Sequence, residues 1–451
     1  MMAPSAGPAP PAPLTLRMGV PWWAHPAWAL LAITGTTAWA ACWLTDQDYE
    51  DNWGVRKWID TNLAQVLAWL IAATLVGLVV AAIPGRGARQ TSIHFTADQI
   101  AFLERAYRAL LLLAVLGYTF WVAVGVANGV DVDHLAAVLD RGDGAISQLK
   151  RLARPVAGLT TLTQFGPVAV ALGVLLRRLG QPRRGFWWLF ALAGVRTLFY
   201  AERLALMEVA IPALLIVAAT VPETRRPSAR LAVQSLPFVA GPGVWLLFAV
   251  SEYGRNWIHH QATARTSFLE WVTTRFAGYY TTCFNNSALI ARRFPTFAVD
   301  PYFSFSFFWD APGVDQFASP GLINGMSPGS WWAWTRTALG NPEFTNTGSF
   351  LTTFAELDFA GALAYWLVVG VVFGRLHNGL RSGQLSALLA HACLFVTILE
   401  LPRFIYIVQG RATPVVLALA VIALAYPKPL SEPAATPGVR WLVPVGRTED
   451  G

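Results

Sequence analysis

The sequence predicts an all-α polytopic membrane protein, and three observations support this fold class. The 451 residues are 55% hydrophobic but only 13% charged, about half the charged share of a soluble domain. Long stretches without a formal charge recur along the chain, and their lengths are close to the ~20 residues that a helix needs to cross a hydrocarbon core. These stretches are continuously apolar and rich in Leu and Ala, whereas the strands of a transmembrane barrel would alternate. A water-soluble globular protein is therefore excluded.

The apolar stretches predict about ten transmembrane helices. Eight uncharged stretches are each expected to form one helix: residues 26–45, 61–85, 109–130, 155–176, 231–251, 359–374, 382–399 and 412–427. Residues 185–221 are long enough for two crossings and are interrupted by charged residues near the middle, so we interpret them as a helical hairpin. Helices 1–7 then lie within residues 25–251, and helices 8–10 within residues 348–427. Residues 1–24 and 428–451 are rich in Pro and Ala and are expected to be disordered tails.

Arginines in the short loops determine the expected orientation. They fall on one side of the membrane: Arg177, Arg178, Arg183, Arg184, Arg225, Arg226, Arg230, Arg375 and Arg381. Because basic short loops stay in the cytoplasm, both termini are expected there. The N-terminus lacks the basic region and cleavage site of a signal peptide, so the first span is expected to be retained. The positive excess faces anionic lipid, and nucleic acid is not an expected partner.

Two outer loops are long enough to have structure of their own. Residues 131–154 place aliphatic residues at helical spacing opposite basic ones, which predicts helices lying on the membrane surface. Residues 252–347 form one large extracytoplasmic loop between helices 7 and 8 and are dense in aromatic residues. These aromatics have two open interpretations: an interfacial belt with a small core, or flat faces for stacking sugar rings. A loop of this length usually has a function.

Metal and disulfide chemistry have weak signals. The three cysteines have no paired spacing and indicate neither disulfides nor zinc: Cys42, Cys283 and Cys393. Two aspartate pairs, Asp46 with Asp48 and Asp131 with Asp133, offer oxygen ligands for a divalent metal. They leave open a metal-dependent glycosyltransferase that uses a polyprenyl-monophosphate sugar, although such pairs are common in solvated loops.

Ionisable residues within apolar stretches give the sharpest functional signal, because each costs about 2.5–3.5 kcal/mol to insert. Arg196 and Arg203 are seven residues apart and would share one face of a continuous helix. Two guanidinium groups on one face would clamp a phosphate. Alternatively, Glu202 or Glu208 neutralises an arginine and fastens the hairpin, or both arginines extend to the interface.

Two further charged clusters lie near the last spans. Glu400, Arg403 and Arg411 surround a proline that breaks a helix, and the freed backbone groups need protein or water beside them. This cluster predicts a cavity wall, or else an ordinary interfacial loop. Glu356 and Asp358 enter the eighth span, where they either begin a helix, favoured by its dipole, or position an acceptor hydroxyl.

Four short elements, spread from residue 155 to the late spans, carry a resemblance to a known family. They are PVAGLTTLTQ at residues 155–164, ERLAL at 202–206, FAGYY at 276–280 with Asn285 and Asn286, and TTFAELDFAG at 352–361. Together they resemble the oligosaccharide repeat-unit polymerases, the Wzy-type proteins of O-antigen, capsule and exopolysaccharide assembly.

The resemblance implies a glycosyltransferase with a GT-C-like fold in the bacterial cytoplasmic (inner) membrane. It would polymerise undecaprenyl-pyrophosphate-linked oligosaccharide repeat units on the outer leaflet, without a metal or other cofactor. The expected partners are this lipid-linked oligosaccharide, membrane lipids, a chain-length regulator and a flippase. O-antigen ligases are the nearest alternative. A flippase or transporter is another, although the sequence shows no repeated halves.

The chemistry of such a transfer assigns roles to the charged residues. The departing lipid pyrophosphate needs stabilisation of its negative charge, which arginines supply without a metal. The residues expected to bind the pyrophosphate are Arg196, Arg203, Arg403 and Arg411. An inverting transfer also needs a base near the acceptor hydroxyl. The candidate catalytic residues are His259, His260, Glu356, Asp358 and Glu202. The sugar-binding residues are expected within the family-like elements, at Tyr279, Tyr280, Asn285 and Asn286.

Overall fold

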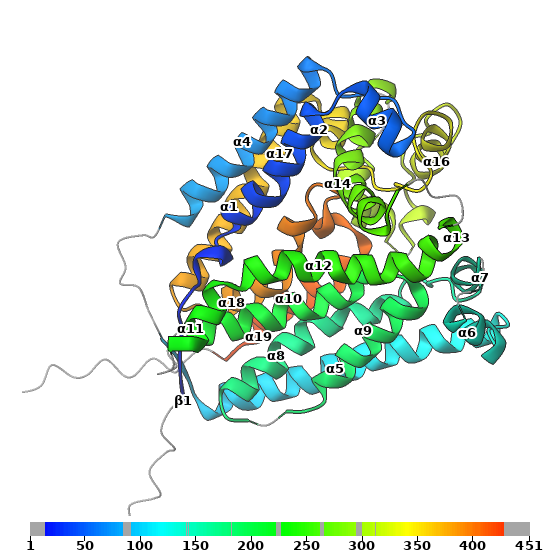
Figure 1. The fold of residues 1–451 in the computed structure, drawn as a ribbon. Helices are drawn as coiled ribbons and strands as arrows, with labels where there is room; N and C mark the ends of the chain where they lie inside the picture. The colour runs from blue at the N-terminus through cyan, green and yellow to red at the C-terminus, as the bar shows by residue number, and fades with distance from the viewer. Residues whose placement is uncertain are drawn as a thin grey trace, which may run out of the picture.

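A computed structural model of the chain shows a mostly helical protein with one small sheet. It describes residues 14–83, 92–140, 142, 144–181, 183–221, 227–261, 266–294, 300–311 and 313–427, without the side chains of His259 and Asp315. The long helices extend between two ends of the molecule (Figure 1). Strand β1 (Leu14–Arg17) and α11 (Pro227–Gln234) lie at one end, and α7 (Ala145–Leu152) and α13 (Ile258–His260) lie at the other.

Six helical segments in the described part of the chain are long and apolar enough to cross a membrane. They are α4 (Thr61–Ala82), α5 (Ala97–Ala127), η3 (Thr160–Phe165) with α8 (Gly166–Arg178), α10 (Arg203–Thr220), α12 (Leu236–Glu252) with η4 (Tyr253–Trp257), and α17 (Phe350–Arg381). A seventh results if the helix formed by α1 (Pro26–Ala29), η2 (Leu30–Gly35) and α2 (Thr36–Trp43) is joined to α3 (Asp46–Trp53), which meets it at 107°.

Three further apolar helices are shorter: α9 (Phe186–Tyr200), α18 (Leu385–Glu400), and η8 (Gly410–Ala412) with α19 (Thr413–Ala425). The structure therefore supports a multi-pass helical membrane protein with six or seven full-length spans. The number of ten spans and the placement of both termini in the cytoplasm stay predictions.

Shorter helices fill the segments between the spans. Within residues 131–154 these are α6 (Val132–Leu139) and α7. Within residues 252–347 they are α13, α14 (Phe268–Arg293), η5 (Phe303–Phe305), α15 (Ser306–Trp309), η6 (Val314–Gln316) and α16 (Pro328–Leu339). Two single turns flank the shorter apolar helices, η1 (Trp22–Ala24) before α1 and η7 (Tyr406–Val408) after α18.

Helix starts follow from capping residues. Asp60 begins α4 by accepting a hydrogen bond from the backbone N–H of Leu63 (2.9 Å). Thr96 and Gln99 form a reciprocal capping box at the start of α5. Each cap satisfies a backbone donor that the first helical turn leaves without a partner. Polar residues at the edges of the apolar stretches therefore fix where these helices begin.

The N-terminal segment corrects one expectation. Strand β1 pairs antiparallel with β2 (Ser92–Phe95), so that Leu14 lies opposite Phe95 and Arg17 opposite Ser92. The disordered tail expected for residues 1–24 is therefore wrong for β1, and the fold is not purely helical. Phe95 is fully buried, which shows that the ribbon belongs to the core. Residues 1–13 and 428–451 lie outside the described residues.

Helix α14 shows that residues 252–347 are not a loop separate from the bundle. Its C-terminal half is buried from Thr281 to Ile290, and it packs against α17 and α2. Two polar residues in this buried half bind backbone groups elsewhere. Asn285 donates to the carbonyl of Arg56 (2.8 Å), and Asn286 donates to the carbonyl of Asn346 (2.8 Å). These bonds compensate for placing amides in the interior.

Helices α4 and α17 cross at a seam of glycines. A Cβ atom at Gly77 of α4 would lie 2.5 Å from the carbonyl oxygen of Leu367, and one at Gly374 of α17 would lie 2.6 Å from that of Leu78. Gly370 faces the backbone of α4 just as closely. Small residues allow membrane helices to pack backbone against backbone, since lipid supplies no hydrophobic drive for helix association.

Replacing Gly77 with leucine should separate α4 from α17. We expect Gly77→Leu to destabilise the protein by at least the ~1–3 kcal/mol typical of overpacking and to lower its Tm in detergent. Gly194→Leu on α9 is the matched control, because a Cβ atom there has no neighbour within 4 Å. Equal melting temperatures for the two variants would contradict the tight seam.

Candidate active site

A break between α9 and α10 determines how the arginines of the hairpin are placed. Ala201 has φ of 48°, a left-handed conformation that non-glycine residues rarely adopt, and α10 restarts only at Arg203. Arg196 and Arg203 therefore do not share a helix face, and the predicted two-arginine clamp on one continuous helix is wrong. Each arginine enters a separate ion-pair cluster.

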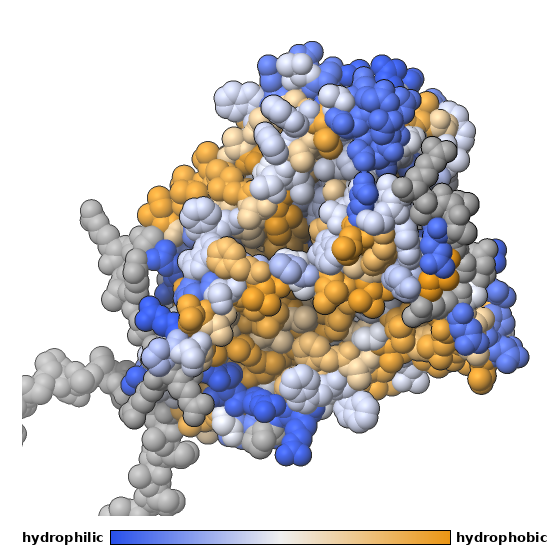
Figure 2. All heavy atoms as spheres, in the orientation of Figure 1, coloured by the Kyte–Doolittle hydropathy of each residue, from blue (hydrophilic) through white to orange (hydrophobic). Residues whose placement is uncertain are grey.

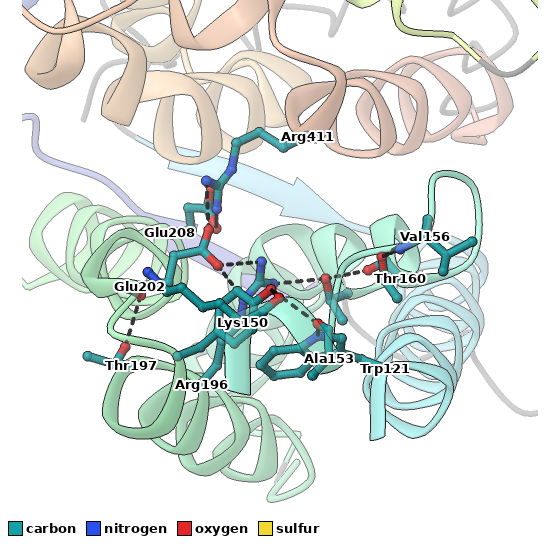
Figure 3. Close-up of polar contacts among 12 residues, drawn as sticks. Trp121, Lys150, Ala153, Val156, Thr160, Arg196, Thr197, Glu202, Glu208 and Arg411 are labelled. Atoms are coloured by element: carbon teal, nitrogen blue, oxygen red, sulfur yellow. Dashed lines mark hydrogen bonds and ion pairs between the residues drawn. The ribbon is translucent and has the colours of Figure 1, made fainter. Parts of the chain in front are cut away.

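The first cluster is centred on Glu202 (Figure 3). One of its carboxylate oxygens accepts from Nε of Arg196 (2.8 Å), and the other contacts Nη1 of Arg411 (2.8 Å). Arg411 also donates to Glu208 (3.0 Å), whose carboxylate accepts from the hydroxyl of Tyr406 (2.7 Å). The cluster joins α9, α10 and the segment that leads into α19.

The second cluster is centred on Glu252, the last residue of α12. Its carboxylate is completely buried and binds Arg203, Arg255 at 3.1 Å and Arg275 at 2.7 Å. Arg203 also lies over the ring of Phe248, 4.1 Å from its centroid, an attractive cation–π arrangement. One carboxylate thus holds arginines from α10, η4 and α14 together.

A third ion pair lies after α18, where the proline ends the helix. Nη1 of Arg403 donates to Glu400 (2.7 Å), and the Arg403 carbonyl accepts from the backbone N–H of Gly348 (3.0 Å). Arg403 Nε is buried and has no hydrogen-bond partner within the described residues. The pair lies beside the residues that precede α17, and the Nε–H group of Arg403 is left to donate to a ligand.

The clusters surround a cavity of about 260 Å³, here called the arginine cavity. Its charged wall residues are Glu202, Arg203, Arg255, Glu400, Arg403 and Arg411. The phenol rings of Tyr279 and Tyr280 and the amide of Asn346 complete its polar lining. Four cations against two carboxylates give the wall itself a positive surplus, although Glu208 and Glu252 lie behind it.

A larger apolar groove of about 630 Å³ adjoins the arginine cavity. The two share Met207, Val244, Phe276, Tyr280 and Glu400 as walls. The groove is formed mainly by apolar residues of α1, η2, α10 and α12. Figure 2 shows a hollow with hydrophobic walls on the face where these helices meet. A polar, cationic cavity therefore lies next to an apolar groove and shares part of its wall.

Arg255 also borders a neighbouring polar cavity of about 320 Å³, which it shares with Lys150 of α7. Burial lowers the pKa of the Lys150 ammonium group, and the positive charge of Arg255 lowers it further. The hydroxyl of Tyr200 donates to the carbonyl of Ala153 (3.1 Å) and so fastens this surface segment to α9. Arg255 thus borders both polar cavities and links the arginine cavity to the segment at α7.

Six of the predicted site residues line the arginine cavity: Glu202, Arg203, Tyr279, Tyr280, Arg403 and Arg411. Arg196 lies behind Glu202, against Thr163 and the ring of Trp121. It therefore orients Glu202 and is not itself part of the wall. Asn285 and Asn286 are engaged by backbone groups, as described above, and neither lines the cavity.

The predicted bases other than Glu202 lie elsewhere. Glu356 accepts hydrogen bonds from the backbone N–H groups of Phe303 and Ser304 (2.6 and 2.8 Å), which anchors η5. Asp358 occupies a kink in α17 with φ of 58° and accepts from the N–H of Phe359 (2.7 Å). His260 packs against two tryptophan rings, and the side chain of His259 lies outside the described residues. None of the three described side chains lines the arginine cavity.

The aspartates considered as metal ligands also have local partners. Asp48 accepts from the backbone N–H of Thr45 (2.7 Å) in a capping box, and Asp131 accepts from the N–H of His134 (2.9 Å). Both bonds lower the pKa of the carboxyl group. In the part of the chain that the structure describes, no group of three or more His, Cys, Asp or Glu side chains is arranged to hold a metal ion.

Sequence reasoning missed Arg255, Arg275 and Glu252. Glu252 lies just outside the seventh expected span, residues 231–251, because that uncharged stretch ends at the first charged residue. The helix in fact continues through η4 to Trp257, which carries Glu252 and Arg255 into the site. The signal that was available is the spacing of these two residues, three positions apart on one helical face.

Comparison with protein-family models, curated proteins and solved structures finds no match for this chain. The geometry of the arginine cavity and the groove is therefore what indicates a function.

Replacing Glu252 with glutamine tests whether one carboxylate holds the second cluster. The substitution leaves Arg203, Arg255 and Arg275 next to each other without their shared counter-charge, and breaking a buried ion pair costs about 3–5 kcal/mol. Glu252→Gln should therefore lower the Tm strongly, whereas Glu270→Gln, an exposed position on α14, should not. Similar Tm values for the two proteins would show that the cluster contributes little to stability.

Proposed function

We propose that this protein is a membrane glycosyltransferase that polymerises undecaprenyl-pyrophosphate-linked oligosaccharide repeat units at the outer leaflet. The observation that supports it is the wall that the arginine cavity shares with the apolar groove. A substrate with a long isoprenoid chain, a diphosphate and a sugar has the same succession of apolar and anionic parts. The sequence resemblance to Wzy-type polymerases points to the same substrate.

The arginines suit the diphosphate because each guanidinium has five N–H donors and its carboxylate partner uses only some of them. Arg403 keeps its Nε unbonded among the described residues, and Arg203 and Arg255 share a single carboxylate with a third arginine. Donors fixed in advance by ion pairs cost little reorganisation when negative charge develops on a leaving group. Departure of the lipid pyrophosphate thus needs no metal.

The apolar groove suits the isoprenoid chain. Its walls between α1 and α12 are formed by Trp28, Ile33, Ala240, Val244 and their neighbours, and burial of apolar chain there is favourable at about 25 cal/mol per Å². The chain would lie in the groove while the diphosphate meets Arg203, Arg403 and Arg411. The anomeric carbon then lies within the arginine cavity.

Glu400 replaces the bases that the sequence suggested. It lines both the groove and the arginine cavity, and only one of its carboxylate oxygens is bound by Arg403. Both oxygens of Glu202, in contrast, are occupied by arginines. We assign Glu400 the role of accepting the proton of the acceptor hydroxyl as the new glycosidic bond forms and the lipid pyrophosphate leaves.

Surface polysaccharide from a deletion strain tests the activity. Loss of the gene should reduce the polysaccharide ladder on a gel to a single repeat unit. Free polymer without its final acceptor would indicate a ligase, and loss of the exported single repeat would indicate a transporter.

Complementation with Arg203→Lys tests the fork of the guanidinium. Lysine keeps the charge but not the paired donors, so chain synthesis should fall at least about tenfold, the equivalent of one charge-assisted hydrogen bond. Arg151→Lys is the matched control, since Arg151 is exposed on α7 and lies outside the cavity. Wild-type ladders from the Arg203 variant would count against the role of its guanidinium.

Glu400→Gln tests the proposed base. Removing a general base typically reduces turnover by about 10²–10⁴, while the lipid-linked repeat unit should still co-purify with the protein because the arginines remain. Glu270→Gln again serves as the control. Activity within twofold of wild type in the Glu400 variant would assign the proton transfer to another group.

A further inference from the structure

A second polar cavity lies at the far end of the apolar groove. It has a volume of about 380 Å³, and its polar side chains are His25, His377 and Arg381. Trp22 and Trp28 form part of its wall and part of the wall of the groove. We call it the histidine cavity. The groove therefore shares walls with two polar cavities.

Helix α12 shows that the two cavities lie at opposite ends of the bundle. The indole of Trp23 donates to the carbonyl of Val233 (2.8 Å), and that of Trp22 donates to the carbonyl of Gln234 (3.2 Å), just before α12 begins. Glu252 and the arginines lie at its other end. The 17 residues of α12 correspond to about 25 Å at 1.5 Å per residue. Figure 1 shows α11 and α13 at these two ends of α12.

Three imidazole rings pack together beside the histidine cavity. The ring centroids of His25 and His377 are 4.5 Å apart, and those of His377 and His391 are 5.5 Å apart. His25 Nδ1 accepts from the backbone N–H of Ala27 (3.2 Å), so its proton is on Nε2, which is then a donor. His377 is only 2% exposed, and its Nδ1 has no hydrogen-bond partner within the described residues.

Arg381, at the end of α17, supplies the positive charge of this cavity. Among the described residues, no carboxylate lies within ion-pair distance of its guanidinium. This differs from the arginine cavity, where every wall arginine has a carboxylate partner. A half-buried cation without a counter-charge, next to a histidine N–H donor, is a site suited to an anion.

We propose that the histidine cavity binds the phosphate headgroup of a membrane lipid from the leaflet at that end of the bundle. The phosphate oxygens accept from Arg381 and from Nε2 of His25, and one hydrocarbon chain runs past the packed rings of Trp22 and Trp28 into the apolar groove. The tryptophan rings suit this boundary, because indoles favour the level where headgroups meet chains. The same groove thus serves an anionic headgroup at each end.

The occupant is a lipid and not a free anion because the polar groups open directly onto an apolar groove. Free phosphate would satisfy Arg381 but would make no contact with the apolar wall that Trp22 and Trp28 form beside it. This inference does not depend on the proposed glycosyltransferase activity, since the groups that bind the phosphate, Arg381 and His25, lie at the other end of the bundle from the arginine cavity. Failure of one leaves the other standing.

Native mass spectrometry of the purified full-length protein tests the proposal. The probes are phosphatidic acid, phosphatidylcholine and inorganic phosphate, each added to protein in detergent. We expect bound phosphatidic acid on the wild type, much less phosphatidylcholine, and no displacement by inorganic phosphate at equal concentration. Retention of inorganic phosphate with no preference for phosphatidic acid would overturn the lipid assignment.

Variants locate the site. Arg381→Ala should reduce the apparent affinity for phosphatidic acid about tenfold or more, as expected for loss of a charge-assisted hydrogen bond. Arg375→Ala is the matched control, an exposed arginine on the same helix that does not line the cavity. Arg381→Lys keeps the charge and most of the side-chain stem, and should give intermediate binding. Unchanged binding in both Arg381 variants would show that the lipid lies elsewhere.

Discussion

The arrangement of this protein depends on one constraint: an ionised side chain buried in an apolar bundle needs an opposite charge beside it. Glu252 is completely buried and binds arginines from three different elements. Glu202 joins Arg196 of α9 to Arg411 near α19 in the same way. The carboxylates therefore decide where the guanidinium groups lie. They also hold these groups at the cavity before any ligand arrives, which is the condition for electrostatic catalysis.

Sequence patterns located the long apolar helices and the helices within residues 131–154, but not helix α14 or strand β1. A long stretch without charged residues is a strong signal for a membrane-spanning helix, since a hydrocarbon core accepts few other segments. Helix α14 gave no such signal because Asn285 and Asn286 sit in its buried half, where only tertiary partners satisfy their amides. Strand β1 is four residues long, and its pairing with β2 joins segments far apart in the chain, which no local pattern reveals.

The site was predicted in part for the same reason. Arg203, Arg403 and Arg411 stood out as charges near apolar stretches, and all three line the arginine cavity. Arg196 has an identical signature but lies behind the wall, because the break at Ala201 turns the two halves of the hairpin apart. Glu356 shows the other limit: a buried carboxylate that anchors a distant turn looks, in sequence, like one that performs chemistry.

The exposure of α12 has a consequence for how a lipid reaches the groove. Only 17% of the apolar window of α12 is buried, yet this helix forms one wall of the groove. A molecule that enters along such a wall arrives from within the bilayer, where abundance is counted per area of membrane and not per volume of water. Occupancy of the groove would then follow the mole fraction of that lipid in the membrane. Adding inert lipid would lower this mole fraction, and with it the occupancy, even when the total amount of the binding lipid in the sample is unchanged.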